Sequence, residues 1–336
     1  MQTSENMKTK LLLFLCACAL LAVAATTNVI VGKYEVPKAK VTARVVDESG
    51  MPIISANIHF AFATATSSTQ VAPVQGITDD SGEFVAEGHC GGMLGSRVTK
   101  DGYYESAVNI PKFVDLQDGK WQPWNPTAMT VLRPIGKLVA LYAKRVQTQI
   151  PVLDKPCGYD LEAGDWVMPY GKGMKKDFIF TIHKDVRGMQ DYDAQGELTF
   201  VNPLDGLQDV PKPAVAYSEY KWERQASEYG YEAKFQLRNT WFPSGSGKKP
   251  IRSFKKETEW EGYFFRVRTV EQAGKIVSAH YGKIRGGIEI EPRETPTCTV
   301  IFTYYFNPTP NDRNLEWDTK RNLFGGLTDT ETPREP

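Results

Sequence analysis

The chain has 336 residues, 41% of them hydrophobic, and its 40 basic and 40 acidic side chains give a formal net charge of zero. This length predicts two domains of ordinary size. A near-neutral chain without basic tracts argues against nucleic acid or an anionic membrane surface as a partner.

The N-terminus has the features of a secretory signal peptide. Lys8 and Lys10 precede an uncharged apolar run over residues 11–25 that ends in small side chains. The run is shorter than the ~20 residues of a membrane-spanning helix. We therefore expect residues 1–25 to be removed and the mature chain to be secreted or periplasmic. Cys18 stands in a sequence typical of lipoprotein cleavage, but too few apolar residues precede it, so a lipoprotein is the less favoured alternative.

Residues 41–104 show the alternation of β-strands separated by turns. Hydrophobic and polar side chains alternate over residues 41–45 and again over 56–60, with Gly50 and Pro52 in the turn between them. The order of these strands and turns resembles the carboxypeptidase regulatory-like, or transthyretin-like, β-sandwich. The resemblance implies a fold that carries functions of many kinds, and no activity of its own.

A second turn follows within this region. Asp79 and Asp80 are expected to accept hydrogen bonds that fix the turn, and the spacing matches no calcium-binding EF-hand loop. Gly82 is expected to adopt a positive φ, so that Ile77 and Phe84 flank a tight reversal between adjacent strands.

Residues 36–136 are predicted to form the first domain. Within it, residues 111–126 are rich in Asp, Gly, Trp and Pro and favour a long loop, and residues 127–134 favour the strand that closes the sandwich. Residues 137–152 are typical of a strand that links the two domains without a flexible break.

The second half also has the pattern of strands. Apolar and polar side chains alternate, with Gly and Pro between the runs, over residues 177–183, 231–237, 263–270 and 299–306. We predict a second β-sandwich domain over residues 137–324, and hence an all-β protein made of two β-sandwich domains. Residues 325–336 lack apolar periodicity and predict a disordered tail. Residues 156–173 and 307–318 resemble segments of uncharacterised secreted bacterial proteins, which implies no activity.

Three cysteines remain after removal of the signal peptide: Cys90, Cys157 and Cys298. An odd number in an oxidising compartment leaves at least one thiol free. A disulfide between Cys157 and Cys298 is the favoured pairing because both belong to the second half. The alternative is three small buried side chains.

The usual catalytic motifs are absent from the sequence. None of His59, His89, His183 and His280 begins the H-x-x-E or H-E-x-x-H spacing of a zinc enzyme. Residues 245–247 have neither the spacing of a serine nucleophile elbow nor that of a phosphate-binding loop. We therefore expect no metal and no cofactor.

Acidic residues give the best enzymatic alternative. Glu257, Glu259 and Glu261 would share one face of a strand and Trp260 the other. Carboxylates on strands can reach the ~5–9 Å separations of glycosidases, so a glycan-active hydrolase is one hypothesis. A solvated strand face opposite a buried tryptophan is the simpler interpretation.

Aromatic residues in loops give the favoured hypothesis. Trp121, Trp124, Trp241 and Phe242 lie in Pro- and Gly-rich segments, and their flat faces would suit a sugar ring or a protein partner. Alternatively they cap the ends of the sandwiches. We expect a secreted, non-catalytic binding or cell-envelope protein that recognises a glycan or a surface protein. The glycan-active hydrolase is the first alternative to this binding protein, and a purely structural envelope component is the second.

Overall fold

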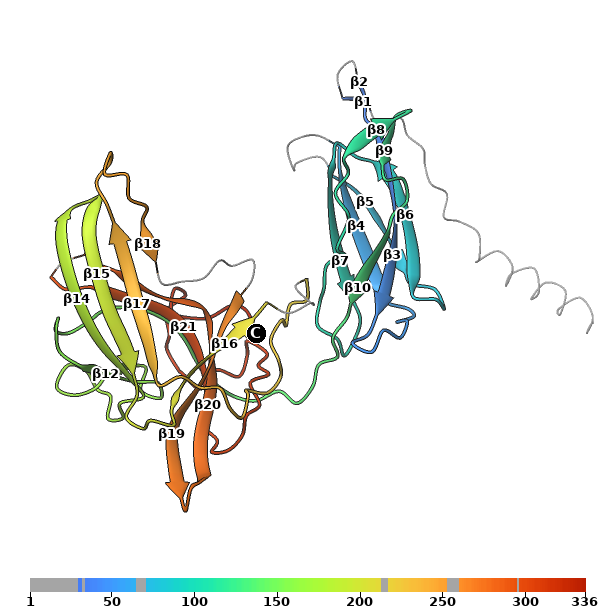
Figure 1. The fold of residues 1–336 in the computed structure, drawn as a ribbon. Helices are drawn as coiled ribbons and strands as arrows, with labels where there is room; N and C mark the ends of the chain where they lie inside the picture. The colour runs from blue at the N-terminus through green and yellow to red at the C-terminus, as the bar shows by residue number, and fades with distance from the viewer. Residues whose placement is uncertain (1–29, 32–33, 65–70, 213–216, 253–259, 295) are drawn as a thin grey trace, which may run out of the picture.

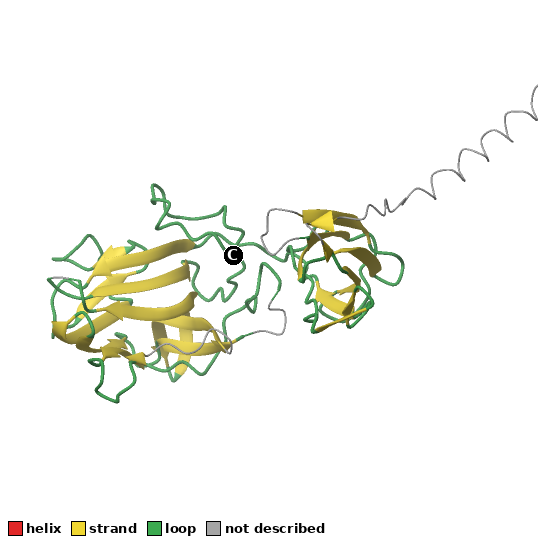
Figure 2. Ribbon diagram, turned by 90° about the horizontal axis from the view of Figure 1, so that it is seen from above, coloured by secondary structure: helices red, strands yellow, loops and turns green. Residues whose placement is uncertain are grey.

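All regular structure in the described chain is β-strand, which confirms the all-β prediction (Figures 1 and 2). The computed structural model describes residues 30–31, 34–64, 71–212, 217–252, 260–294 and 296–336. The predicted signal peptide and Cys18 lie outside these residues. Within them, no helix is long and apolar enough to cross a membrane. The strands gather into an N-terminal lobe, residues 34–134, and a C-terminal lobe, residues 137–336.

Two sheets form the N-terminal lobe, beside a short ribbon of β1 (Ile30–Val31) and β2 (Tyr34–Glu35). The first sheet contains β3 (Lys38–Val46), β6 (Glu83–His89), β8 (Asp115–Gln117), β9 (Lys120–Gln122) and β10 (Thr127–Val131). The second contains β4 (Asn57–Ala63), β5 (Val71–Ile77) and β7 (Met93–Thr99). The predicted closing strand is β10, and it pairs with β3 in parallel.

The core of this lobe follows the predicted alternation. Val41, Ala43 and Val45 of β3 are fully buried, and they pack with Phe60 and Phe62 of β4 across the two sheets. The segment 111–126 differs from the prediction of a loop, since it contains the short strands β8 and β9. The one sign of these strands in the sequence is Asp118-Gly119, a dipeptide that is typical of a hairpin turn. In the structure, β8 and β9 pair on either side of it.

The Gly82 turn has the predicted conformation but a different role. Gly82 has a φ of 75°, and Asp79 accepts hydrogen bonds from Ser81 and from the Glu83 N–H, as expected. The predicted reversal between adjacent strands is wrong, because β5 and β6 belong to different sheets. The turn instead carries the chain from one sheet to the other, and Phe84 packs on Gly76 across the interior.

Replacing Gly82 with valine should destabilise the N-terminal lobe by roughly 1–3 kcal/mol. A Cβ at this position would meet the Val45 carbonyl oxygen at 2.6 Å, in addition to the strain of a positive φ. Gly50 is a matched control, since its φ is 83° in a similar Asp-x-Ser-Gly turn but nothing lies within 4 Å of an added Cβ. Urea titration of both valine variants should show the larger loss for Gly82. Equal losses would refute the steric part of this explanation.

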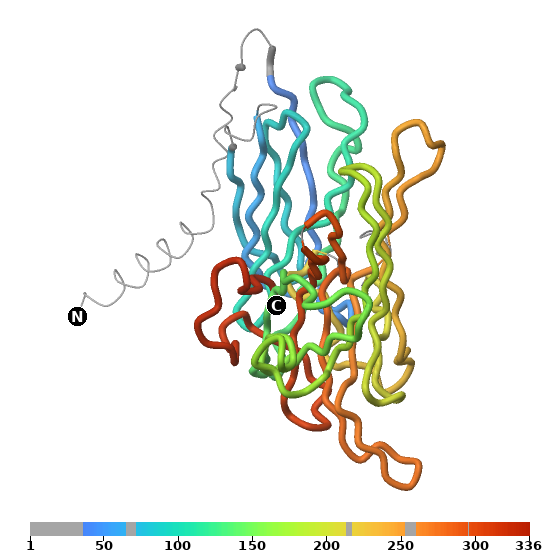
Figure 3. Tube along the Cα trace, turned by 90° about the vertical axis from the view of Figure 1, so that its left-hand side faces the viewer, coloured from blue at the N-terminus to red at the C-terminus, as the bar shows by residue number. Residues whose placement is uncertain are grey.

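Two antiparallel sheets form the C-terminal lobe. The first has the order β11 (Tyr142–Gln149), β21 (Thr299–Asn307), β20 (Lys275–Glu291), β19 (Trp260–Gln272) and β16 (Gly206–Pro211). The second has the order β13 (Asp165–Trp166), β12 (Cys157–Asp160), β14 (Phe178–Gly188), β15 (Asp191–Thr199), β17 (Lys234–Trp241) and β18 (Ile251–Arg252). The hairpin of β19 and β20 extends beyond the rest of the lobe (Figures 1 and 3).

One hydrophobic core lies between these two sheets. Phe178 and Phe180 of β14 face Phe265 of β19 and Phe302 of β21, with the Phe178 and Phe265 rings 5.3 Å apart. The strand prediction over residues 177–183 is confirmed, because Phe178, Phe180 and Ile182 are all buried on one face. The predicted strands near 263–270 and 299–306 correspond to β19 and β21.

The predicted disordered tail is wrong, because residues 325–336 are ordered against the first sheet of the C-terminal lobe. The Arg145 N–H donates to the Glu331 carbonyl at 2.7 Å, Lys144 forms an ion pair with the Glu331 carboxylate at 3.1 Å, and the Tyr305 hydroxyl donates to the Glu335 carbonyl at 2.8 Å. Pro333 is buried. These contacts are polar and non-periodic, so hydrophobic patterning gave no sign of them.

The predicted disulfide between Cys157 and Cys298 is not formed. Cys90, Cys157 and Cys298 are free and buried. The Cys157 thiol lies 3.5 Å from the Val152 carbonyl, whereas the Cys298 thiol lies 3.8 Å from the carbonyl of Thr299. Each thiol therefore fills its own small space in the core, and burial raises the pKa of Cys298 to about 12.

Candidate binding cleft between the lobes

Backbone hydrogen bonds join the two lobes directly. The Ala107 N–H donates to the Tyr217 carbonyl at 3.0 Å, and the Glu219 N–H donates to the Glu105 carbonyl at 2.8 Å, with Ser218 buried between these contacts. Two extended segments, one from each lobe, therefore pair over a short length. The lobes are held together by this pairing as well as by the chain that connects them.

Arg133 forms the polar centre of the junction. This residue follows β10, is 4% exposed, and donates to the carbonyl oxygens of Tyr220 at 2.9 Å and Trp222 at 2.8 Å. Its Nε donates to the Glu48 carboxylate at 2.8 Å, and its guanidinium lies 5.2 Å from the centre of the Tyr220 ring. A buried guanidinium with this many acceptors fixes both the position and the angle of the segment that it contacts.

A second arginine extends the network. Arg224 pairs with Glu48 at 3.0 Å and with Glu316 at 3.3 Å, and Glu316 accepts from the Tyr104 hydroxyl at 2.9 Å. Burial alone would raise the pKa of Glu48, but the two guanidinium groups lower it below its ordinary value. Burial and the Glu316 carboxylate both raise the pKa of Tyr104, so its hydroxyl remains a donor at neutral pH.

Lys283 of β20 lies beneath this junction in a cage of aromatic rings. Its amine is fully buried, has no hydrogen-bond partner among the described residues, and lies 5.0 Å from the ring centre of Tyr220, 5.2 Å from Trp222 and 4.8 Å from Tyr305. Burial lowers the pKa of Lys283 to about 7. Because Tyr220 also stacks on Tyr104 of the other lobe at 5.0 Å, the cage and the junction share one ring.

A cleft of about 810 Å³ opens beside the two arginines. Both lobes line it, with these residues: Glu48, Val131, Arg133, Gln208, Asp209, Val210, Pro211, Lys221, Glu223, Arg224, Gln225, Ser227 and Phe264. Pockets for small ligands frequently occur at interfaces between domains and have volumes of about 300–1,000 Å³.

The lining combines an apolar surface with a polar rim of balanced charge. Val131, Val210 and Phe264 supply the apolar part, and the amides of Gln208 and Gln225 stand among three acidic and three basic side chains. Most of the N–H donors of Arg133 and Arg224 already bond to carboxylate and carbonyl oxygens within the protein. The cleft therefore suits a neutral ligand that offers both hydroxyl groups and C–H faces, and it has no excess charge with which to attract an ion.

The predicted aromatic residues do not come together in one site. Trp121 is half-buried against the core of the N-terminal lobe, with its indole N–H donating to the Cys90 carbonyl at 2.7 Å. Trp124 is also half-buried, under the Lys120 amine at 5.2 Å from the ring centre. Trp241 and Phe242 follow each other at the end of β17 in the other lobe. All four are absent from the lining of the cleft, and a binding role for them stays a prediction.

Two of the three predicted acidic residues, Glu257 and Glu259, lie outside the described residues. Glu261 is half-buried on β19, and the neighbouring Trp260 is 6% exposed, as the predicted alternation requires.

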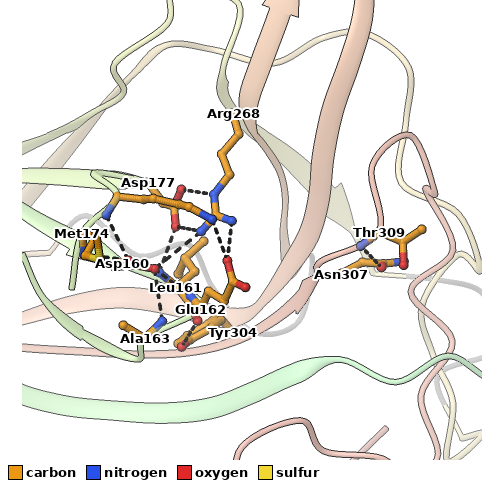
Figure 4. A network of polar contacts seen from close by, with 11 residues as sticks. Asp160, Leu161, Glu162, Ala163, Met174, Asp177, Arg268, Tyr304, Asn307 and Thr309 are labelled. Atoms are coloured by element: carbon orange, nitrogen blue, oxygen red, sulfur yellow. Dashed lines mark hydrogen bonds and ion pairs between the residues drawn. The ribbon is translucent and has the colours of Figure 1, made fainter. Parts of the chain in front are cut away.

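Another carboxylate cluster does form in the C-terminal lobe, around Arg268 (Figure 4). Arg268 donates to both oxygens of Asp177 at 2.7 and 2.8 Å and to Glu162 at 2.7 Å, and it reaches Asp160 at 3.5 Å. The Asp160 carboxylate also accepts hydrogen bonds from four backbone N–H groups, two on each oxygen. Burial raises the pKa of Asp177, while these N–H donors lower that of Asp160 against the opposing effect of burial. Since the oxygens are so fully used, we interpret the cluster as a structural network.

Most of the cleft residues have no local signature that the sequence could have revealed. They come from segments near residues 48, 131, 208, 224 and 264, which only the fold brings together. One signal was present in the segment from Tyr220 to Arg224, where aromatic and charged residues alternate. That pattern predicts an extended segment with a buried aromatic face and a polar face, as the structure shows for Tyr220 and Trp222.

Comparison with known proteins adds no assignment. No protein-family model matches the chain, and no curated protein matches it either. The resemblance of residues 41–104 to carboxypeptidase regulatory-like domains therefore remains an expectation from the sequence.

Proposed function

We propose that this protein is an exported, non-catalytic binding protein that holds a neutral polysaccharide chain in the cleft between its lobes. The observation that carries the proposal is the charge-balanced cleft, with its apolar surface and glutamine rim, at a junction held by buried hydrogen bonds. Sugar rings present apolar C–H faces and many hydroxyl groups but no charge, which matches such a lining. The N-terminal lobe would then act as a carrier that completes one wall.

A glycan array of the mature protein, with hydrolysis assays on the same glycans, tests this function. We expect binding to uncharged polysaccharides without release of shorter products. Hydrolysis of a bound glycan would overturn the non-catalytic assignment and favour the hydrolase. Absence of any glycan binding would favour a protein ligand or a purely structural component.

Filling the cleft should abolish this binding. Val131→Trp places a large ring in the cleft. We expect it to raise the Kd for the glycan, measured by calorimetry, at least tenfold, or by about 1.4 kcal/mol. Met129→Trp is the matched control, because Met129 lies two residues earlier on β10, is 61% exposed and does not line the cleft. Gln225→Ala should weaken glycan binding less than Val131→Trp does. Gln236→Ala is its control, because Gln236 is exposed and does not line the cleft. Equal effects of the two tryptophan variants would place the ligand elsewhere.

A further inference from the structure

Three large apolar side chains stand exposed on one loop of the C-terminal lobe. Met168 is 69% exposed, Tyr170 is 50% exposed and Met174 is 84% exposed, all within the segment after β13. Single apolar side chains on a surface are ordinary, but three within seven residues place an unusual amount of exposed apolar surface on one loop, which is typical of an interaction site. We call residues 167–176 the methionine loop.

The protein holds this loop firmly, so its exposure does not come from a loose conformation. Asp165 accepts from the N–H groups of Trp166 at 2.8 Å and Lys172 at 3.0 Å. Asp160 accepts from the N–H groups of Met174 and Lys175, both at 2.9 Å, as Figure 4 shows in part. Trp166 itself is buried in the core at the start of the loop. The apolar side chains are therefore presented in advance of binding, which reduces the entropy lost when a partner is bound.

The charge on the loop indicates the kind of partner. The loop contains Lys172, Lys175 and Lys176, all exposed, and no acidic residue. Lys175 pairs with Glu162 at 2.9 Å, whereas Lys172 and Lys176 have no ion pair with any residue that the structure describes. Apolar side chains surrounded by lysines are complementary to a lipid surface that carries anionic headgroups.

We propose that the methionine loop docks the protein on an anionic lipid surface, with Met168, Tyr170 and Met174 entering the interface and the lysines contacting headgroups. The near-zero net charge of the whole chain gives no long-range attraction to such a surface. At physiological ionic strength, however, charges beyond about 8 Å are screened. The local lysines therefore decide the contact, and each contributes about fivefold to the partition coefficient.

Cosedimentation of the mature protein with vesicles tests the proposal. We expect partition onto vesicles of phosphatidylcholine and phosphatidylglycerol, mixed roughly two to one, and little onto phosphatidylcholine alone. Lys172→Glu with Lys176→Glu should reduce partition at least 25-fold, since two lysines are lost and two like charges are added. Met168→Ser with Met174→Ser should reduce it at least tenfold. Met189→Ser is the control, because Met189 is 71% exposed in the turn between β14 and β15, and it should have no effect.

Three results would overturn the proposal. Equal partition onto the two kinds of vesicle would remove the role of charge, and equal effects of the two methionine variants would remove the role of this loop. Absence of vesicle binding together with loop-dependent binding of soluble polyglutamate would assign the loop to an acidic protein segment instead. Circular dichroism of each variant confirms that the fold is retained.

Discussion

Replacing Arg268 with alanine should lower the free energy of unfolding by about 3–5 kcal/mol, the usual result of breaking a buried ion pair from one side. The side chain of Asp177 is 1% exposed and that of Asp160 is 6% exposed, so neither carboxylate can be hydrated in place of the lost guanidinium. The loss should be smaller at mildly acidic pH. Unpaired Asp177 would have a still higher pKa in the folded state, and a raised folded pKa means that stability falls as pH rises through it.

Urea titrations of this variant at neutral and at mildly acidic pH provide the measurement. Arg187→Ala is the control, since Arg187 pairs with Asp185 and Asp191 on the surface and should leave stability unchanged. If Arg268→Ala were as stable as the wild type, the cluster in Figure 4 would not be the structural network that we describe, and Asp160 and Asp177 would become candidates for an active site.

Replacing Lys283 with methionine should stabilise the protein at neutral pH. The folded-state pKa of about 7 lies well below the ordinary value of 10.5, which corresponds to a penalty on the order of 4–5 kcal/mol for the charged amine. The three aromatic faces attract the ammonium by about 0.5–1 kcal/mol each, or about 1.5–3 kcal/mol together, which offsets part of this penalty. We therefore expect Lys283→Met to raise the free energy of unfolding by about 1–3 kcal/mol, because methionine fills a similar volume without a buried charge.

The stability that Lys283→Met gains over the wild type should shrink as the pH rises. Below pH 7 the amine is charged in both states and the full penalty is present. Between about pH 7 and 10.5 the folded protein loses the proton while the unfolded chain keeps it, so stability of the wild type increases. Urea unfolding at neutral pH and at about pH 9.5 tests this. A variant that is less stable than the wild type at both values would show that the ammonium and its aromatic cage stabilise the fold.

Strand positions in the core could be predicted because periodicity reports burial on a single face. Val41 to Val45 in one lobe and Phe178 to Ile182 in the other alternate clearly, and both are buried as expected. The partners of each strand could not be predicted in this way. The Gly82 turn shows why, since the same Asp-x-Ser-Gly residues suit a hairpin and a connection between two sheets equally well.

Polar contacts between distant segments explain the remaining differences. The tail over residues 325–336 is held by backbone and carboxylate contacts of Glu331 and Glu335, which leave no hydrophobic pattern. The cleft likewise depends on Arg133 and Arg224, whose acceptors lie 85 to 176 residues away in the sequence. A single charged residue in a sequence does not indicate which of many acceptors it will meet.

Hydrogen–deuterium exchange with a glycan that binds in the array tests the central claim most directly. We expect the glycan to protect amides in β16 and in the segment around Lys221 and Gln225, which line the cleft on the side of the C-terminal lobe. Protection confined to peptides that contain Trp121 and Trp124, or to those that contain Trp241 and Phe242, with the cleft peptides unchanged, would contradict it.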